Sequence, residues 1–272
     1  MPIDTRRLTG PEGTISPYSL AKNDPNTSVV EGSERADGRK PDKVRPLFLR
    51  AGLITQARGS AYIEQNETKV ICAVYGPREV VRKEDFSMKG QLTCEFKFAT
   101  FSCRLRRKHQ QDSEEKDFSV QLLEALEPAV CLHKFPKSQV NVYVTVLQNA
   151  GSALAASITC AALALADAGI EMYDLVTGCS ARVRGDTILL DPTESEEYKP
   201  EQTAEKNNGS VTVGLMPSLN QVSAITSKGE IDFQLATKAI KDCVETCQRL
   251  YPVLQQALET ALKQRLKDAD TG

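Results

Sequence analysis

The residues best suited to chemistry in this 272-residue chain are a Gly151-Ser152 turn directly before a nearly all-apolar segment, which predicts a buried helix from Ser152 to Ala168. The free N–H groups at such a helix start can hold a phosphate, and a neighbouring arginine strengthens the site. The next residue is Ala153, so the turn lacks a cation. The helix dipole alone adds only about 0.3–1 kcal/mol. Because Ser is a preferred capping residue, a simple helix N-cap is favoured over a working anion site.

A basic run from Lys97 to Lys108 is the second candidate for chemistry. It carries five cations and two aromatic residues and no acidic residue. Such a run fits a solvated loop as well as a nucleic-acid contact, and the residues alone leave both open. The acidic run from Asp112 to Asp117 that follows is expected to favour the start of a helix rather than to bind a metal.

Metal and cofactor sites are not expected. The eight cysteines are scattered without a C-x-x-C pair, and the chain has two histidines. A zinc site or a disulfide framework is therefore disfavoured, and buried free thiols are the simpler interpretation. Asp167 and Asp191 are interpreted as structural residues at a helix end and a turn.

Composition places the chain among ordinary globular proteins, with 40% hydrophobic and 26% charged residues. A net charge of -2 argues against a protein that coats nucleic acid over its whole surface, although a local patch is compatible with it. No apolar run is long enough to span a membrane, and the first residues lack the apolar core of a secretory signal. An intracellular protein is therefore expected.

The elements that would position these residues can be predicted from periodicity. Residues 1–36 lack apolar periodicity and are expected to form a disordered or extended arm. Helical spacing predicts helices over Ser113–Cys131, Ser152–Ala168 and Asp232–Lys267, the last bent near Pro252. Alternating apolar residues predict nine strands: Leu47–Ile54, Ser60–Glu64, Lys69–Tyr75, Leu92–Phe98, Val140–Leu147, Leu175–Val183, Thr187–Leu190, Val211–Leu215 and Gln221–Thr226. Gly76-Pro77 is expected to interrupt the strands.

This order of elements predicts an α+β fold in which mixed β-sheets pack with helices in two related sub-layers. The expected division is an arm over 1–36, one domain over 37–169, and a second domain over 170–268 that ends in the long helix. Periodicity does not give the order of the strands.

Seven motifs, taken in order and spacing, resemble the RNase PH family of phosphorolytic exoribonucleases. They cover nearly everything after residue 36: Asp37-Gly38-Arg39 with Arg45-Pro46, Gly59-Ser60-Ala61, Thr68-Lys69-Val70, Gly76-Pro77-Arg78, Leu126-Glu127-Pro128-Ala129-Val130, Ala164-Leu165-Ala166-Asp167-Ala168-Gly169 and Leu190-Asp191-Pro192-Thr193. Within the family, the closest resemblance is to the RNase PH-like ring subunits of the eukaryotic RNA exosome.

The resemblance implies an RNase PH-like fold and a place in a six-membered ring. The implied partners are other RNase PH-like ring subunits, RNA-binding OB-fold cap subunits, RNA in a central channel and associated exosome nucleases, with no membrane and no cofactor. It also implies work in 3′-to-5′ RNA processing and decay, in the nucleus, nucleolus and cytoplasm.

Catalytic residues of active family members are replaced at three places in this chain. The arginine of their Gly-Ser/Thr-Arg turn becomes Ala153, their two aspartates correspond to Glu197 and Ser210, and their arginine pair becomes Ser113 and Glu114. Phosphorolysis brings two anions together and needs fixed positive charge. A non-catalytic subunit is therefore expected, and an active phosphate-dependent 3′ exoribonuclease is the alternative. A guanidinium and two acidic groups converging on one pocket at the start of the buried helix would contradict the first interpretation.

In a ring whose channel carries RNA, the basic run becomes the candidate RNA-binding site, formed by Arg104, Arg106, Arg107 and Lys108. Contacts from these side chains to phosphate would be independent of base sequence. A purely structural ring segment that never touches RNA remains a third interpretation.

Overall fold

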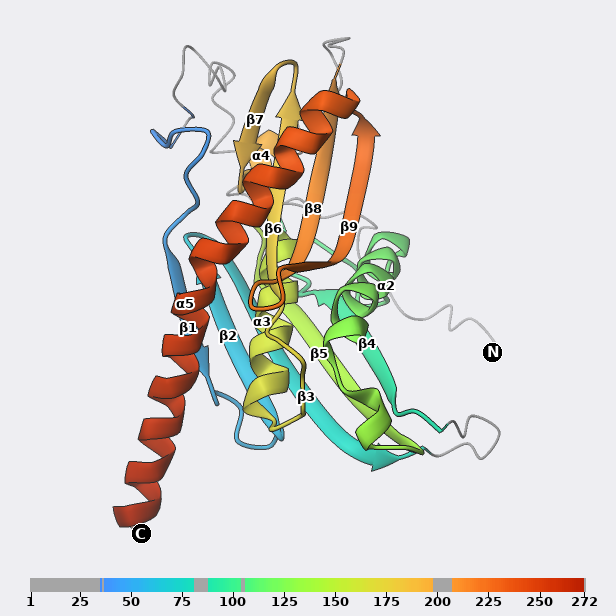
Figure 1. Cartoon of the computed structure of the whole chain (residues 1–272), viewed down its shortest axis with the longest axis vertical. Helices are drawn as coiled ribbons and strands as arrows, with labels where there is room; N and C mark the ends of the chain where they lie inside the picture. Colours follow the sequence, from blue (N-terminus) through green and yellow to red (C-terminus); the bar gives the residue numbers. More distant parts are fainter. Residues whose placement is uncertain (1–34, 36, 81–87, 104–105, 198–206, 272) are drawn as a thin grey trace, which may run out of the picture.

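The computed structural model describes residue 35 and residues 37–80, 88–103, 106–197 and 207–271. In this part of the chain, two β-sheets enclose a layer that contains two helices, and a long helix covers the far face of the second sheet and continues to the edge of the first (Figure 1). The α+β fold class and the two sub-layers predicted from the sequence are confirmed.

The first sheet has five strands in the order β1-β2-β3-β5-β4. Neighbouring strands are antiparallel except β4 and β5, which are parallel, so the sheet is mixed. Its strands are β1 Leu47–Ala51, β2 Gly59–Gln65, β3 Thr68–Glu79, β4 Gln91–Phe98 and β5 Ser138–Gln148.

The second sheet has four antiparallel strands in the order β7-β6-β8-β9. Its strands are β6 Thr177–Arg184, β7 Thr187–Leu190, β8 Asn208–Met216 and β9 Gln221–Glu230. The two sheets thus fall on either side of the predicted boundary at residue 169. Whether each half is a separate domain stays a prediction.

Helix α3 (Ala153–Asp167) lies between the two sheets and contacts strands of both. Every residue from Ala153 to Leu165 is buried, which explains why this helix has no polar face. The helix packs so closely on the second sheet that a Cβ atom at Gly178 of β6 would lie 2.4 Å from the carbonyl oxygen of Ala155. The close packing fixes the start of α3 against the second sheet.

Helix α2 (Ser113–Leu126) lies beside the edge strand β4. A capping box formed by Asp112 and Glu115 starts the helix, as the acidic residues of this segment predicted. Glu115 also accepts a hydrogen bond from the Phe98 N–H at 2.9 Å, and Ser119 accepts one from the Phe96 N–H at 3.0 Å. Side chains of α2 therefore satisfy backbone groups along the free edge of β4.

The remaining helices are short, except for α5. Two 3-10 turns, η2 (Glu127–Ala129) and η3 (Leu132–Lys134), follow α2, and α4 (Glu194–Glu197) follows β7. Helix α5 (Phe233–Thr271) packs on β6 and β8 and reaches β1 of the first sheet, and it continues on both sides of Pro252. None of the helices in the described ranges combines the length and apolar character required to cross a membrane.

Three details differ from the predicted elements. The helix predicted to Cys131 ends at Leu126, because Pro128 cannot donate the hydrogen bond that a longer helix needs. The interruption predicted at Gly76-Pro77 is local, since β3 continues to Glu79 but its pairing with β5 shifts register between Tyr75 and Arg78. Helix α4 was not predicted. Almost all of the predicted arm lies outside the described residues.

Candidate functional site

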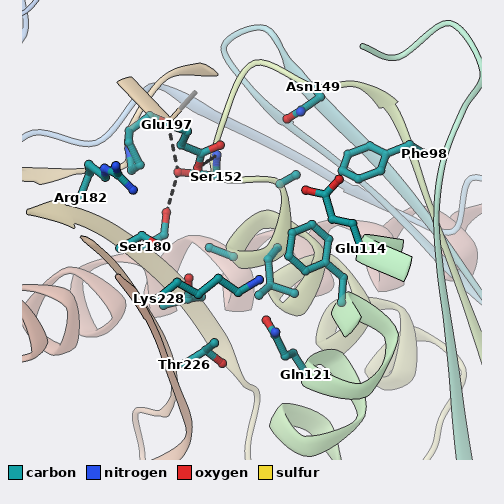
Figure 2. A pocket seen from close by; sticks show the side chains of 17 residues that line it. Phe98, Glu114, Gln121, Asn149, Ser152, Ser180, Arg182, Glu197, Thr226 and Lys228 are labelled. Atoms are coloured by element: carbon teal, nitrogen blue, oxygen red, sulfur yellow. Dashed lines mark hydrogen bonds between the residues drawn. The ribbon is translucent and has the colours of Figure 1, made fainter. Parts of the chain in front are cut away.

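A pocket of about 250 Å³ lies between the two sheets at the start of α3. Figure 2 shows the side chains that line it. Four of the positions singled out from the sequence line this one pocket: Glu114, Ala153, Glu197 and Ser210. The prediction that these replacements fall on one site is therefore confirmed for them, whereas Ser113 is not among the lining residues.

Gly151 makes the sharp turn before α3. Its φ of +99° lies in the region that favours glycine, and a Cβ there would lie 2.3 Å from the carbonyl oxygen of Pro192. Ser152 follows in a left-handed conformation with a φ of 56°. The turn is therefore tight and lies close against the Pro192 loop.

Ser152 takes the predicted N-cap position of α3, but its side chain does not cap the helix. Its hydroxyl makes no capping hydrogen bond to α3. It instead lies 2.7 Å from the Ser180 hydroxyl and donates to the Pro192 carbonyl at 3.3 Å. The left-handed backbone directs the side chain away from the first turn of the helix, so the hydroxyl joins α3 to the second sheet.

Glu197 places its carboxyl group at this turn. One of its carboxylate oxygens accepts a hydrogen bond from the Ser152 N–H at 2.8 Å. Burial raises the pKa of Glu197 to about 7, with Asp191 adding to the rise, although the Ser152 N–H and the charges of Arg45 and Arg182 oppose it. The chain thus places a carboxyl group of its own where a bound phosphate would be expected.

Two cations in the pocket, Arg182 and Lys228, were missed by sequence reasoning. They lie in one cross-strand row with Ser210, because Arg182 of β6 pairs with Ser210 of β8 and Ser210 pairs with Lys228 of β9. Arg182 donates to the Asn208 side chain at 2.6 Å, and Lys228 lies 3.1 Å from a carboxylate oxygen of Asp117. The alternation of side chains along each strand shows which residues share a face of the sheet. It does not show that Arg182 and Lys228 lie near each other until the order of the strands is known.

The pocket therefore contains a guanidinium and two acidic groups, which is the condition that was expected to contradict a non-catalytic site. Their arrangement differs from a converging set. Figure 2 shows Glu114 beside Phe98, on the opposite wall from Arg182 and Glu197. Glu114 accepts a hydrogen bond from Arg107 at 2.9 Å, so its charge is already compensated. Glu197 occupies the start of α3.

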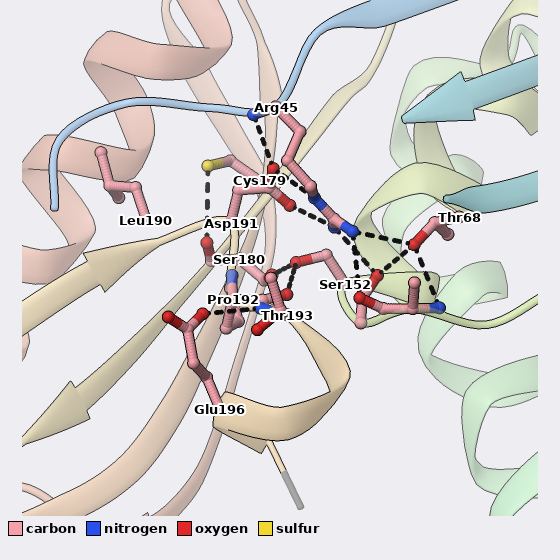
Figure 3. Close-up of polar contacts among 12 residues, drawn as sticks. Arg45, Thr68, Ser152, Cys179, Ser180, Leu190, Asp191, Pro192, Thr193 and Glu196 are labelled. Atoms are coloured by element: carbon pink, nitrogen blue, oxygen red, sulfur yellow. Dashed lines mark hydrogen bonds and ion pairs between the residues drawn. The ribbon is translucent and has the colours of Figure 1, made fainter. Parts of the chain in front are cut away.

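Behind the pocket, Arg45 holds the turn in place (Figure 3). Its guanidinium donates to Asp191 at 2.6 and 2.8 Å, and to the Ala150 and Gly151 carbonyls, each at 3.0 Å. A further bond reaches the Thr68 hydroxyl at 3.0 Å. Burial would raise the pKa of Asp191, but the hydrogen bonds and charge of Arg45 outweigh it and lower the pKa.

These contacts agree with the structural role predicted for Asp191. Asp167 is structural as well, since it accepts a hydrogen bond from the Ser60 N–H at 2.9 Å and pairs with Arg265 at 2.7 Å. Arg35 is 4% exposed and forms an ion pair with Glu196 of α4. Arg35 is thereby joined to α4, whose last residue, Glu197, lines the pocket.

The predicted RNA-binding residues are only partly brought together. Arg104 lies outside the described residues. Arg106 and Lys108 are exposed, whereas Arg107 is half-buried between Phe98, whose ring centroid is 4.8 Å away, and the carboxylates of Asp112 and Glu114. Arg106 and Lys108 are thus free to meet a large ligand, while Arg107 has a structural role. Their RNA binding stays a prediction.

All eight cysteines are free thiols, and six of them are buried, as predicted. Burial raises the pKa of Cys94 to about 12, which keeps this thiol protonated near neutral pH. Among the described residues, no group of three or more His, Cys, Asp and Glu side chains is arranged to hold a metal ion.

Comparisons with known proteins agree with this geometry. Residues 43–171 match the family model of the RNase PH 3′ exoribonuclease family, domain 1. The chain is 43% identical to the human exosome complex component MTR3, over 97% of this chain and 98% of that protein. It is 33% identical to the fission yeast (Schizosaccharomyces pombe) exosome complex component mtr3, over 94% of this chain and 95% of that protein.

Solved structures share the fold. The crystal structure of rice (Oryza sativa) Rrp46 superposes with a TM-score of 0.71 at 25% identity and covers 82% of this chain and 100% of Rrp46. A chain of the Archaeoglobus fulgidus exosome, solved with RNA bound to the active site, gives a TM-score of 0.70 at 21% identity, over 86% of this chain and 94% of that chain.

Proposed function

Because the chain belongs to the RNase PH family of 3′ exoribonucleases, as a member of its Mtr3 type, we propose that it is a non-catalytic subunit that scaffolds the exosome ring and lines the RNA path. It is a ring subunit of the RNA exosome, with other RNase PH-like subunits and RNA as partners. OB-fold cap subunits and associated exosome nucleases are further proposed partners. The exosome is a nuclear and cytoplasmic RNA-processing complex, and we place this subunit in the nucleus, nucleolus and cytoplasm.

The Glu197 carboxyl at the start of α3 is the observation that carries the non-catalytic assignment. An incoming phosphate would need the Ser152 N–H that Glu197 already holds at 2.8 Å, and Ala153 offers no cation to replace it. When Glu197 is ionised, it also repels the phosphate: repulsion between two unit charges about 4 Å apart is roughly 1 kcal/mol even in water, and it is larger in a buried pocket. The carboxyl group therefore disfavours the anion that phosphorolysis requires.

An active phosphate-dependent 3′ exoribonuclease is the second candidate, because Arg182 and Lys228 give the same pocket positive charge. The two candidate functions can be distinguished by one reaction product, the nucleoside diphosphates that phosphorolysis of RNA releases. We expect the purified full chain, incubated with single-stranded RNA and inorganic phosphate, to release no nucleoside diphosphates above a no-protein control. Phosphate-dependent release of nucleoside diphosphates, lost in Arg182→Ala, would establish the active enzyme instead.

The RNA-path assignment predicts a separate effect of the exposed cations. Changing Arg106 and Lys108 together to Ala should weaken RNA binding by the reconstituted ring and reduce the slope of log affinity against log salt by about 1 per lost phosphate contact. Titrations of labelled RNA at several salt concentrations measure both quantities. Lys267→Ala at the far end of α5 is a control for unspecific loss of charge. An unchanged affinity and slope would favour the purely structural subunit.

A further inference from the structure

The five-stranded sheet has one face turned away from α3, here called the outer face. Residues that point to α3, such as Ile63, Val70 and Val144, are almost fully buried, whereas the alternating residues are partly or fully exposed. Strand pairing aligns one row across all five strands of this face: Arg50, Tyr62, Ile71, Thr145 and Lys97. In the described part of the chain, this face is open to solvent.

Aromatic side chains lie along the outer face in two pairs. Tyr75 and Tyr143 meet edge to face with ring centroids 5.8 Å apart, and Phe48 and Tyr62 do so at 6.5 Å. Tyr143 is 41% exposed and Phe48 is 55% exposed. Aromatic rings on an open sheet are platforms on which unpaired bases can stack.

The charge of this face is mainly positive, although the chain as a whole has a net charge of -2. Lys97 and Arg50 mark the two ends of the five-strand row, and the Arg78 guanidinium lies 5.4 Å from the ring centroid of Tyr75. Two carboxylates, Glu64 and Glu95, also lie there, and Glu64 is 3.9 Å from Lys69. Cations beside stacking rings suit a ligand with a charged backbone and flat bases.

The outer face is also continuous with the exposed cations of the basic run. The Lys97 ammonium donates to the carbonyl oxygen of His109, directly after Arg106 and Lys108 in the chain. A surface hollow of about 520 Å³ lies beside Tyr143 and is lined by polar side chains that include Thr93, Gln139 and Asn141. Aromatic, amide and hydroxyl groups thus surround a space of the size of a ligand pocket.

We propose that the outer face binds single-stranded RNA, with Tyr143 and Tyr75 stacking on bases and Arg50, Arg78 and Lys97 contacting phosphates. This inference rests on the proposed function for the presence of RNA near Arg106 and Lys108. The assignment of the binding site to the outer face rests on its exposed aromatic rings. A protein partner fits less well, because permanent protein interfaces have an apolar centre. The centre of this face is instead mixed with hydroxyl, amide and charged groups.

The test uses the reconstituted ring with the full chain and a single-stranded RNA of about 12 nucleotides that carries 5-iodouridine, a probe that crosslinks to aromatic side chains under light. Mass spectrometry should find the crosslink on peptides with Tyr143 or Tyr75. Tyr143→Thr, which keeps a strand-forming residue, should reduce this crosslink by about 5- to 10-fold without a change in salt slope, since stacking releases no counterions. Tyr173 lies outside this face and is 58% exposed, more than Tyr143, so Tyr173→Thr is the control and should have no effect.

Two further variants keep the outcome clear. Tyr143→Phe should retain the crosslink because the ring remains, and Arg50→Gln should lower the salt slope by about 1 even if Tyr143→Thr does not fold. Crosslinks at Arg106–Lys108 but none on the outer face would overturn this inference and leave the proposed function intact. Loss of ring assembly in Tyr143→Thr, with the crosslink absent from the native ring, would show a protein interface. No crosslink anywhere on this chain would contradict both.

Discussion

Arg45→Met is expected to lower the free energy of unfolding by about 3–5 kcal/mol, the usual cost of removing one partner from a buried ion pair. Arg45 is 3% exposed and Asp191 is 2% exposed. Without the Arg45 side chain, the Asp191 carboxylate would keep the hydrogen bond from the backbone N–H of residue 45 at 2.9 Å and the weaker contact from Arg39 at 3.4 Å, but no close charged partner. The Ala150 and Gly151 carbonyls would lose a donor at the same time.

Urea unfolding of the full chain, followed by circular dichroism, measures this change. Arg249→Met is the matched control, because Arg249 is exposed and pairs with Glu245 one helical turn away. Exposed pairs of this kind contribute only about 0.3–0.5 kcal/mol. A loss below about 1 kcal/mol for Arg45→Met would mean that the surrounding chain relaxes around Asp191 and that Arg45 does not fix the turn.

Glu197→Gln is expected to stabilise the protein at alkaline pH and to change little at acidic pH. The folded pKa of Glu197 is about 7, above the ordinary value of 4.5. A raised carboxyl pKa means that the folded state favours the neutral form, so stability falls as the pH rises from about 4.5 to 7 and then levels off. Gln has no charge to bury, and its carbonyl can still accept the Ser152 N–H. The gain above pH 7 should be on the order of 3 kcal/mol.

Melting temperatures of both proteins between pH 5 and pH 8 show the effect as a difference that grows with pH. Glu259→Gln on the exposed surface of α5, where Glu259 lies 3.5 Å from Lys263, should give a difference that does not vary over this range. Parallel curves for the native chain and Glu197→Gln would show that the carboxyl is not buried in its charged form.

The sequence predicted those elements whose residues have a strong periodic pattern. Helix α3 was predicted within one residue of its start because its apolar run admits only a buried helix. The pocket was predicted in part, since Ala153 and Glu197 are close to strong markers, the Gly-Ser turn and the Leu190-Asp191 strand end. The bond predicted for the Ser152 hydroxyl was wrong, because its left-handed backbone and its partners Ser180 and Pro192 are features of the tertiary structure.

Arg182 and Lys228 could not be predicted for a different reason. They are more than forty residues apart, and they line the same pocket only because β8 lies between β6 and β9. Strand order depends on long-range pairing, which alternation within one strand does not encode. The same holds for Arg45, which contacts residues from β3, the turn before α3 and the end of β7.

The hydrogen bonds from Phe96 and Phe98 to side chains of α2 have a consequence for assembly. Unpaired N–H groups on an edge strand can form hydrogen bonds with a strand of another molecule and so start aggregation. In β4 these donors are already bound by Ser119 and Glu115 of the same molecule. During synthesis and before its partners arrive, a subunit built this way is protected from fibre-like self-association at this edge.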